Sequence, residues 1–342
     1  MGHYKVQMLQ AGYGDCLFVT LDQGTPSEFN ILIDGGLRSC YTNLRHRPMS
    51  NGPLKNLIET LKTQTRKIDL LIITHVDDDH IGGIKYWFED DFPNQEFVSE
   101  IWFNDDVVIN ESQSLQNSPA SAASLLSLLR EKNRSFCNYV VSGMHLERNG
   151  YLFNILSPKP KYRNIVSKKI EGILQNSSKE NEGYKYTLSS LYAHPYANKS
   201  SLSYENRASI AFEIVAPDGE KALFLGDASI KDILEEFENI YPKELWPVNY
   251  SMIKLSHHGS SYNFTPSFLD HVHAQEFLVS TDGNNPGHPL PDKEVLAHIL
   301  NATNSCVCFN YREVVSNIFL PQDYEDMPHL VEKIKCTSDD ES

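Results

Sequence analysis

The sequence predicts an α/β protein in which two mixed β-sheets pack together and helices cover their outer faces. Short apolar runs separated by Gly-rich or polar turns come first, and strand and helix patterns then alternate, twice along the chain. The chain has 342 residues, 40% of them hydrophobic, which is enough to bury a large core. Polar residues with metal-ligand atoms directly follow four of the expected strands.

The pattern of the N-terminal part predicts several strands, followed by helices and strands in alternation. Residues 53–64 carry apolar side chains at the i, i+3, i+4, i+7 spacing of an amphipathic helix. The other elements expected here are strands at 4–9, 16–21, 28–33, 69–74 and 101–103 and a helix at 81–89.

Residues 104–205 differ in composition, being rich in Ser, Asn, Lys and Tyr. Only a helix at 119–131 and a strand at 151–156 stand out in them. We interpret this segment as an insertion over the fold, and the two alternatives are a lid and a solvated loop with no role.

Regular structure resumes at residue 209. Pro217-Asp218-Gly219 predicts the turn of a hairpin between strands at 210–215 and 221–225. The elements expected after it are helices at 229–239, 265–271 and 291–300 and strands at 252–255, 277–280 and 305–310. Residues 336–342 are an acidic tail that we expect to fray.

Composition limits the classes of partner. The formal net charge of −15 argues against tight binding of duplex DNA through a basic face, and it suits a site that collects divalent cations. The longest apolar runs have about half a dozen residues, against the roughly 20 needed to cross a bilayer. The N-terminus has no apolar export signal, so we expect a cytoplasmic protein with no membrane partner and six reduced cysteines.

The densest polar cluster is His75-Val-Asp77-Asp-Asp79-His80, directly after the apolar run 70–74. Imidazole and carboxylate groups together suit Zn²⁺, Mn²⁺ or Fe²⁺. In a loop that leaves a strand, residues two apart can converge on one point. Asp79 and His80 are adjacent and would tend to point apart, toward two metals or toward one metal and one structural contact.

Three other places repeat this theme. Asp34 follows the expected strand 28–33, Asp227 follows the strand 221–225, and His257-His258 follows the strand 252–255. An Asp after a strand is most often a turn or cap residue, and a lone His is most often structural. Because four such places occur in one chain, we expect a metal site.

These residues resemble those of the metallo-β-lactamase superfamily and, within it, the soluble domain of ComEC-type DNA-uptake proteins and their stand-alone relatives. The similarity spans almost the whole chain outside the insertion. It implies a four-layer αββα sandwich, a single domain over 1–335 and a metal site along one edge. The motifs that carry the resemblance are QAGYGDC at 10–16, LIDGG at 32–36, THVDDDHIGG at 74–83, NRASI at 206–210, LGD at 225–227, SHHGS at 256–260 and GHP at 287–289.

The resemblance also implies two divalent metal ions, Zn or Mn. His75 and Asp77 would hold the first ion, and Asp79 and His80 would hold the second. Asp227 would bridge the two. Asp77 stands where the wider superfamily has its second histidine, and this replacement is typical of ComEC-type members.

The remaining ligands are less completely specified by the motifs. His257 or His258 would complete the second site, and we favour His257. The superfamily usually supplies a further histidine before the bridging Asp, but the matching place reads Asn206-Arg207-Ala-Ser. The first ion is then weakly held, lost, or completed by water.

The chemistry that the resemblance implies is hydrolysis by a metal-bound hydroxide, with a phosphodiester as the substrate. Asp79 would also accept a proton, while His288 and His258 would donate to the leaving oxygen or bind the phosphate. Arg207 and Lys254, with Asn206 beside them, would contact the phosphate. The alternative for Lys254 is that it only covers its own strand.

Three functions stay open from the sequence. The first is a phosphodiesterase or nuclease, a stand-alone enzyme acting on nucleic acid or another phosphodiester, with a protein partner in a defence system. The second is a hydrolase of a small phosphocholine ester, lactone or thioester, which the acidic charge favours because small substrates need no basic track. The third is a metal-bound interaction protein with little catalysis.

Overall fold

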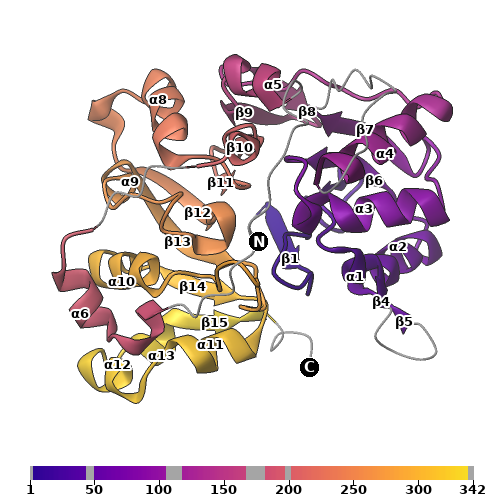
Figure 1. Cartoon of the computed structure of the whole chain (residues 1–342). Helices are drawn as coiled ribbons and strands as arrows, with labels where there is room; N and C mark the ends of the chain where they lie inside the picture. The colour runs from indigo at the N-terminus through magenta and orange to yellow at the C-terminus, as the bar shows by residue number, and fades with distance from the viewer. Residues whose placement is uncertain (1–2, 44–49, 105–117, 167–181, 197–201, 338–342) are drawn as a thin grey trace.

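Two β-sheets lie face to face between two layers of helices (Figure 1). This is the expected four-layer αββα sandwich. The computed structural model describes residues 3–43, 50–104, 118–166, 182–196 and 202–337. In the part of the chain so described, no helix is both long and apolar enough to cross a membrane.

The first sheet has the order β1-β2-β3-β6-β7, antiparallel through β3 and parallel from β3 to β7. Its strands alternate their side chains between two cores, so Leu71 and Ile73 face the helices while Leu70 and Ile72 face the second sheet. The strands of this half are β1 (Tyr4–Met8), β2 (Leu17–Leu21), β3 (Phe29–Ile33), β6 (Ile68–Ile73), β7 (Val98–Phe103) and the separate pair β4 (Thr42–Asn43) and β5 (Ser50–Asn51).

The second sheet has the order β15-β14-β13-β12-β11-β10-β9-β8. It is parallel from β15 to β11 and antiparallel from β11 to β8. Its strands are β8 (His145–Arg148), β9 (Tyr151–Ser157), β10 (Ala211–Val215), β11 (Lys221–Phe224), β12 (Val248–Lys254), β13 (Val272–Val279), β14 (Cys306–Phe309) and β15 (Ile334–Cys336).

Helices cover the outer face of each sheet (Figure 1). Apolar side chains of α2, α3 and α4 pack on the first sheet, and those of α8 and α10 pack on the second. The helices are α1 (Arg38–Tyr41), α2 (Pro53–Thr63), α3 (Asp78–Asp90), α4 (Ser118–Glu131), α5 (Pro160–Val166), α6 (Leu188–Ala193), α7 (Tyr204–Arg207), α8 (Ile230–Ile240), α9 (Phe268–His271), α10 (Lys293–Ala302), α11 (Arg312–Ile318), α12 (Pro321–Asp326) and α13 (Leu330–Lys333), with 3₁₀ turns η1 (Glu182–Lys185), η2 (Lys243–Leu245) and η3 (Ser256–Gly259).

A row of aromatic rings joins the two sheets. The ring centroids of Trp102 and Phe153 lie 5.6 Å apart, those of Phe153 and Phe212 lie 6.0 Å apart, and those of Phe212 and Phe224 lie 5.4 Å apart. All four side chains are buried. Contacts of this kind add to the area burial that holds the sheets together.

The segment 104–205 belongs partly to the sandwich itself. Its helix α4 packs on the first sheet, and β9 pairs with β10, so that β8 and β9 form one edge of the second sheet. The expectation of a lid falls largely on residues 105–117, 167–181 and 197–201, which lie outside the described residues, as do 338–342 of the expected tail.

The carboxyl ends of several strands meet at one edge of the sandwich. Asp34 follows β3, His75 follows β6, and Asp227 follows β11. The pair His257-His258 follows β12. Hydrogen bonds and ion-pair distances join these segments across the two sheets, so this edge holds the candidate site.

Candidate metal centre

The first group of side chains at the site comes from the segment between β6 and α3 and from the first turn of α3. Asp77 is the N-cap residue of α3, and its carboxylate caps no backbone N–H of the helix. It is therefore available for other contacts. Asp79 and His80 lie in the first turn, where the positive end of the helix dipole favours a carboxylate. His80 is fully buried.

The second group enters from the other sheet. Gly226, before Asp227, has φ +50°, and a Cβ there would lie 2.4 Å from the Ser209 hydroxyl, so this tight turn needs glycine. His257 and His258 also have positive φ values, 47° and 54°. Residues other than glycine rarely adopt this conformation, which costs about 1–3 kcal/mol and concentrates at functional sites.

One set of ligand atoms surrounds Oδ2 of Asp227. The His75 Nε2 atom lies 3.6 Å from this oxygen and 3.6 Å from Asp77 Oδ2. The His257 Nε2 atom lies 3.7 Å from the same Asp227 oxygen. His75 and His257 therefore both face this oxygen of Asp227, and Asp77 faces His75.

A second set lies at the other oxygen of Asp227. His80 Nε2 is 3.3 Å from Asp227 Oδ1, and His258 Nε2 is 3.6 Å from Asp79 Oδ2. One ligand atom from each of Asp79, His80 and His258 lies within 4.8 Å of the others, as do those of His75, His80 and Asp227. The structure thus places His258, rather than His257, beside Asp79 and His80.

Several buried polar atoms of the cluster have no hydrogen-bond partner in the described structure. They are the Nε2 atoms of His75, His80 and His258 and the Oδ1 atom of Asp227. A buried polar atom without a partner costs free energy, so such atoms are rare. Their convergence on shared points fits divalent metal ions, which they can bind as nitrogen and oxygen ligands.

The far sides of the histidine rings are fixed by other groups. His80 Nδ1 lies 2.8 Å from Asp34, which also accepts hydrogen bonds from the Thr74 backbone N–H and hydroxyl. Because the Thr74 hydroxyl donates to Asp34, it accepts from His75 Nδ1 at 3.0 Å. Both rings then present Nε2 as a lone pair to the cluster, as metal-binding histidines do.

The two histidines after β12 are fixed in the same way. His258 Nδ1 donates to the Ser280 carbonyl at 2.8 Å. The Asn263 amide nitrogen donates to the Asp227 carbonyl, so its oxygen is free to accept from His257 Nδ1 at 2.9 Å. In their neutral form, His75, His80 and His258 therefore present Nε2 as a lone pair to the cluster, whereas Nδ1 of His257 lies between the Asn263 oxygen and the Asn206 amide nitrogen.

A buried ion pair supports His258. Asp15 Oδ1 lies 3.2 Å from His258 Nδ1, and Lys254 Nζ donates to Asp15 Oδ2 at 2.7 Å. All three side chains are buried. Burial alone would raise the pKa of Asp15, but Lys254 and His258 lower it below its usual value.

The pKa values of the cluster are shifted because its imidazoles are packed among carboxylates. Burial opposes charge on His258, yet Asp15, Asp79 and Asp227 raise its pKa to about 9. The pKa of His80 is well above its ordinary value, mainly because Asp227 and Asp34 outweigh the effect of burial. The pKa of Asp227 is well below its ordinary value because His257, His80 and His75 outweigh burial. The carboxylates thus favour positive charge on the imidazoles of the cluster.

Some residues expected at the site take structural roles at its border. Lys254 is 1% exposed, and its ammonium donates a hydrogen bond to Asp15. The Arg207 guanidinium makes two hydrogen bonds of 2.7 Å to Asp232. The Asn206 amide nitrogen lies 3.2 Å from His257 Nδ1 and so touches the cluster from behind.

His288 lies beside the turn that carries the paired histidines. Its Nε2 is 2.8 Å from Asp292 Oδ1, and its ring faces that of Tyr262 edge-on at 6.4 Å. The Asp292 backbone N–H donates to the Gly259 carbonyl. His288 is thus linked through Asp292 to the turn that carries His257 and His258. Its proposed role as a proton donor stays a prediction.

Sequence reasoning missed supporting residues of the site. Asp15 had no role assigned, although it lies within the motif QAGYGDC, and Asp34 was noted only as a polar residue after a strand. Asn263 and Ser280 were not singled out. These residues are distant in sequence from most of the histidines that they contact. Their supporting role can therefore be recognised only when the fold has brought the segments together.

Comparison with known proteins gave one family match and several solved structures. Residues 10–103 match the family model of the metallo-beta-lactamase superfamily, and no curated protein matches the chain. One similar structure is Igni18, a metallo hydrolase from Ignicoccus hospitalis KIN4/I (16% identity, covering 88% of this chain and 93% of that chain, TM-score 0.44).

Two further structures have the same level of similarity. One is a possible metal-dependent hydrolase from Veillonella parvula DSM 2008 (12% identity, covering 98% of this chain and 96% of that chain, TM-score 0.41). The other is a diphosphatase from the PhnP family (11% identity, covering 94% of this chain and 81% of that chain, TM-score 0.39). With TM-scores below 0.5, these similarities do not assign a function.

Proposed function

We propose that this chain, a member of the metallo-β-lactamase superfamily of metallo-hydrolases, is a metal-dependent phosphodiesterase. The observation that carries the proposal is the Asp227 carboxylate. Its Oδ1 faces His80, and its Oδ2 faces His75 and His257. A carboxylate shared in this way suits a pair of metal ions, an arrangement that phosphatases and nucleases use for phosphoryl transfer.

The geometry supports a specific division of ligands. In this proposal, His75, Asp77, His257 and Asp227 would hold the first ion. His257 then takes the place of the histidine that is missing near Asn206. The ComEC-type resemblance rests on Asp77, whose oxygen ligand favours a harder ion such as Mn²⁺ more than a second histidine would.

Asp79, His80, His258 and Asp227 would hold the second ion. His258, rather than the His257 favoured from the sequence, completes this set because its Nε2 lies beside Asp79. Asp34 orients His80, and Asp15 together with the Ser280 carbonyl orients His258. Groups behind the ligands normally set their direction and basicity.

When bound, two divalent ions would activate water and neutralise the charge that develops on the phosphoryl oxygens. The side chains of Asp77, His257 and Asp79 are 30%, 28% and 16% exposed, whereas those of the other ligands are almost fully buried. The substrate therefore enters on the side of these three. In this proposal, Asp79 would accept the proton of the attacking water.

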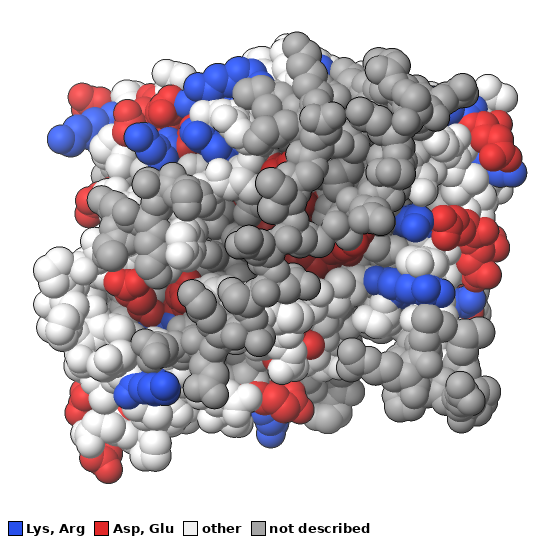
Figure 2. Space-filling view, viewed as in Figure 1, with Lys and Arg blue, Asp and Glu red and all other residues white. Residues whose placement is uncertain are grey.

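The charge distribution favours a small phosphodiester over long nucleic acid. The formal net charge is −15. On the face shown in Figure 2, acidic side chains are visible near the centre, between residues drawn in grey, and the Lys and Arg side chains lie among further acidic ones around them. A groove that follows a nucleic-acid backbone would instead need a basic lining.

The test is hydrolysis of bis-p-nitrophenyl phosphate, followed by DNA and RNA, with added Mn²⁺, Zn²⁺ or Mg²⁺. We expect turnover that depends on the metal, and a loss of at least about a hundredfold in kcat for His75→Ala and for Asp227→Ala. His273→Ala is the matched control, because this exposed histidine of β13 lies outside the cluster.

Metal analysis of the same samples separates the alternatives. Full occupancy by two ions with no turnover of any phosphodiester would contradict the proposal. Turnover of lactones or thioesters instead would support the small-ester alternative. Occupancy without any turnover would support a metal-bound interaction protein.

A further inference from the structure

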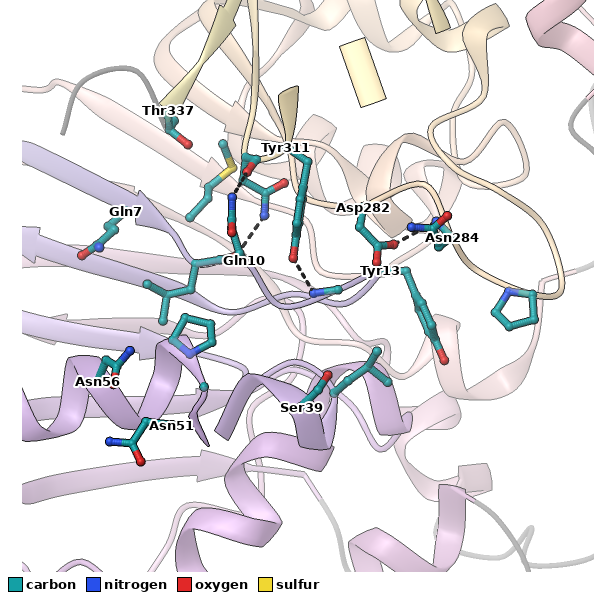
Figure 3. Close-up of a pocket in the computed structure, with 18 residues that line it drawn as sticks. Gln7, Gln10, Tyr13, Ser39, Asn51, Asn56, Asp282, Asn284, Tyr311 and Thr337 are labelled. Atoms are coloured by element: carbon teal, nitrogen blue, oxygen red, sulfur yellow. Dashed lines mark hydrogen bonds between the residues drawn. The ribbon is translucent and has the colours of Figure 1, made fainter. Parts of the chain in front are cut away.

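A cavity of 870 Å³ lies outside the metal cluster, and Figure 3 shows the residues that line it. Its walls come from β1 and the turn after it, from α1 and the start of α2, and from the loops after β13 and β14. The volume falls in the range of about 300–1,000 Å³ that small-molecule sites occupy. None of the ligand residues of the cluster lines this cavity.

Two short segments connect the cavity to the metal cluster. In the first, Gly12 and Tyr13 line the cavity, while Asp15 contacts His258. In the second, the Ser280 carbonyl accepts from His258, and Asp282 lines the cavity. Because consecutive Cα atoms are about 3.8 Å apart, the cavity begins within about 8 Å of the groups that support His258.

Backbone contacts fix this connection. The Asp15 backbone N–H donates to the Asp79 carbonyl at 3.1 Å, and a Cβ at Gly14 would lie 1.9 Å from that carbonyl oxygen. The Asp282 N–H donates to the Gly12 carbonyl at 2.9 Å. The cavity wall and the second metal set are thus parts of one rigid arrangement rather than separate loops.

The lining of the cavity is polar but nearly uncharged. Amide side chains contribute most of its polar groups, and among the described residues that line it the one ionisable acid or base, tyrosines apart, is Asp282. The amides are those of Gln7, Gln10, Asn51, Asn56, Asn284 and Asn310. Among its described residues, this lining offers donors and acceptors together and no cation to hold a phosphate. The amide of Asn310 is already bonded to the Leu9 carbonyl and the Thr281 N–H, so the other amides are the ones that can meet a ligand.

Two tyrosines shape the cavity. The Tyr311 hydroxyl accepts from the Gly12 backbone N–H at 2.8 Å, so its ring is held in the wall. Tyr13 stands next to Asp282 (Figure 3). Burial and the nearby charges of Asp79 and Asp282 raise its pKa, so its hydroxyl stays neutral and its ring offers a flat face.

From this geometry we infer that the cavity binds the nucleoside portion of a phosphodiester whose phosphate lies at the metal centre. This inference rests on the proposed function and names its substrate class. Amide groups match the donor and acceptor edges of a base, ribose hydroxyls add further partners, and an aromatic ring can stack on the base. The nearly uncharged lining suits the neutral nucleoside, while the metal cluster would bind the charged phosphate.

The test compares two substrates that share a leaving group. Bis-p-nitrophenyl phosphate has no nucleoside, whereas the p-nitrophenyl ester of thymidine 5′-monophosphate has one. The variant Asn56→Trp places a bulky ring in the cavity from the exposed side of α2. Thr63→Trp, also exposed and on the same helix but outside this cavity, is the matched control.

For the wild-type protein we expect kcat/KM to be at least about tenfold higher for the nucleoside ester. Asn56→Trp should remove this preference by raising KM, with bis-p-nitrophenyl phosphate unaffected, and Thr63→Trp should keep it. Equal kcat/KM for both substrates, or equal losses on both in Asn56→Trp, would overturn the inference.

A binding measurement keeps the inference separate from the proposed function. Titration calorimetry of thymidine and adenosine into the purified protein needs no turnover. Binding that Asn56→Trp abolishes and Thr63→Trp retains supports the nucleoside site, even where no phosphodiester is cleaved. No binding of either nucleoside, or binding of a methyl glycoside alone, overturns it.

Discussion

At the scale of single residues, the adjacent histidines after β12 decide how the cluster is divided. With φ values of 47° and 54°, His257 and His258 lie on a left-handed turn, and their Nε2 atoms approach different carboxylates. An extended strand would send neighbouring side chains to opposite faces of the sheet. The turn instead lets both serve one cluster, one on each side of Asp227.

The protonation of His258 predicts how the metal-free protein responds to pH. The pKa of this group is raised from 6.5 to about 9 in the folded state. Its contribution to stability is therefore fully present below about pH 6.5 and is lost as the pH rises through about 9. The raised pKa values of His75 and His80 act in the same direction.

We therefore expect the melting temperature of the metal-free protein to fall between about pH 6 and pH 9.5, as scanning calorimetry with a chelator would show. Metal affinity should rise over the same range, because the ion displaces these protons. His258→Gln should show a weaker pH dependence. A melting temperature that is constant or rises over this range would contradict this account.

Asp15 offers a second prediction at this scale. In Asp15→Asn the side chain keeps its shape but loses the charge that faces His258 and Lys254. We expect the affinity for the second ion to fall about 10- to 100-fold, measured by competition with a fluorescent chelator.

The control for this variant is Asp323→Asn, which breaks another buried pair of a lysine with a carboxylate, Lys293–Asp323. Both variants should lower the free energy of unfolding, because each leaves a buried ammonium without its partner. Only Asp15→Asn should change metal affinity. Equal affinities in the two variants would show that Asp15 is structural and does not position His258.

At the scale of elements, the sequence was most informative where apolar runs were long or strictly periodic. The expected strands at 4–9, 16–21 and 28–33 match β1, β2 and β3 closely, and the expected helix at 53–64 is α2. Their patterns reflect burial on one or both faces, which the fold preserves.

The elements that were missed are short or half-exposed. Helices α12 and α13 have 6 and 4 residues, too few to show a helical period, and β15 has 3. The first half of β13 alternates exposed and buried residues, so only its apolar end at 277–280 was predicted. Helix α9 covers only Phe268–His271 of the expected 265–271, because a turn precedes it.

For the site too, features that depend on neighbouring residues in the sequence could be predicted, and features that depend on contacts between distant segments could not. Residue type and position after a strand were enough to identify His75, Asp227 and the paired histidines as candidates. The choice between His257 and His258 depends on a left-handed turn that their sequence does not encode locally. The contact of Asp15 with His258 joins the first turn of the chain to β12, and only the assembled sandwich reveals it.

At the scale of the whole molecule, the cluster joins the two sheets. His75, Asp79 and His80 come from the segment after β6 in the first sheet. Asp227 and His258 come from the second sheet. Bound ions would thus link the two layers, in addition to the aromatic contacts between them.

Removal of the metal should therefore lower global stability. Ligand concentrations of about 100 Kd stabilise a folded protein by about 2.7 kcal/mol. We expect a chelator to lower the melting temperature of the metal-loaded protein by several degrees, and to leave that of Asp227→Asn unchanged. The same shift in both proteins would mean that the chelator acts elsewhere.

The placement of the ligands along the chain also bears on biosynthesis. A ribosome releases the segment 75–80 long before Asp227 and the turn at His257-His258. The nascent chain cannot complete either ion set until that turn has emerged and the second sheet has formed. Under the proposed function, metal acquisition would be a late event, and a translation product truncated before residue 257 would leave a partial, weakly binding set of ligands.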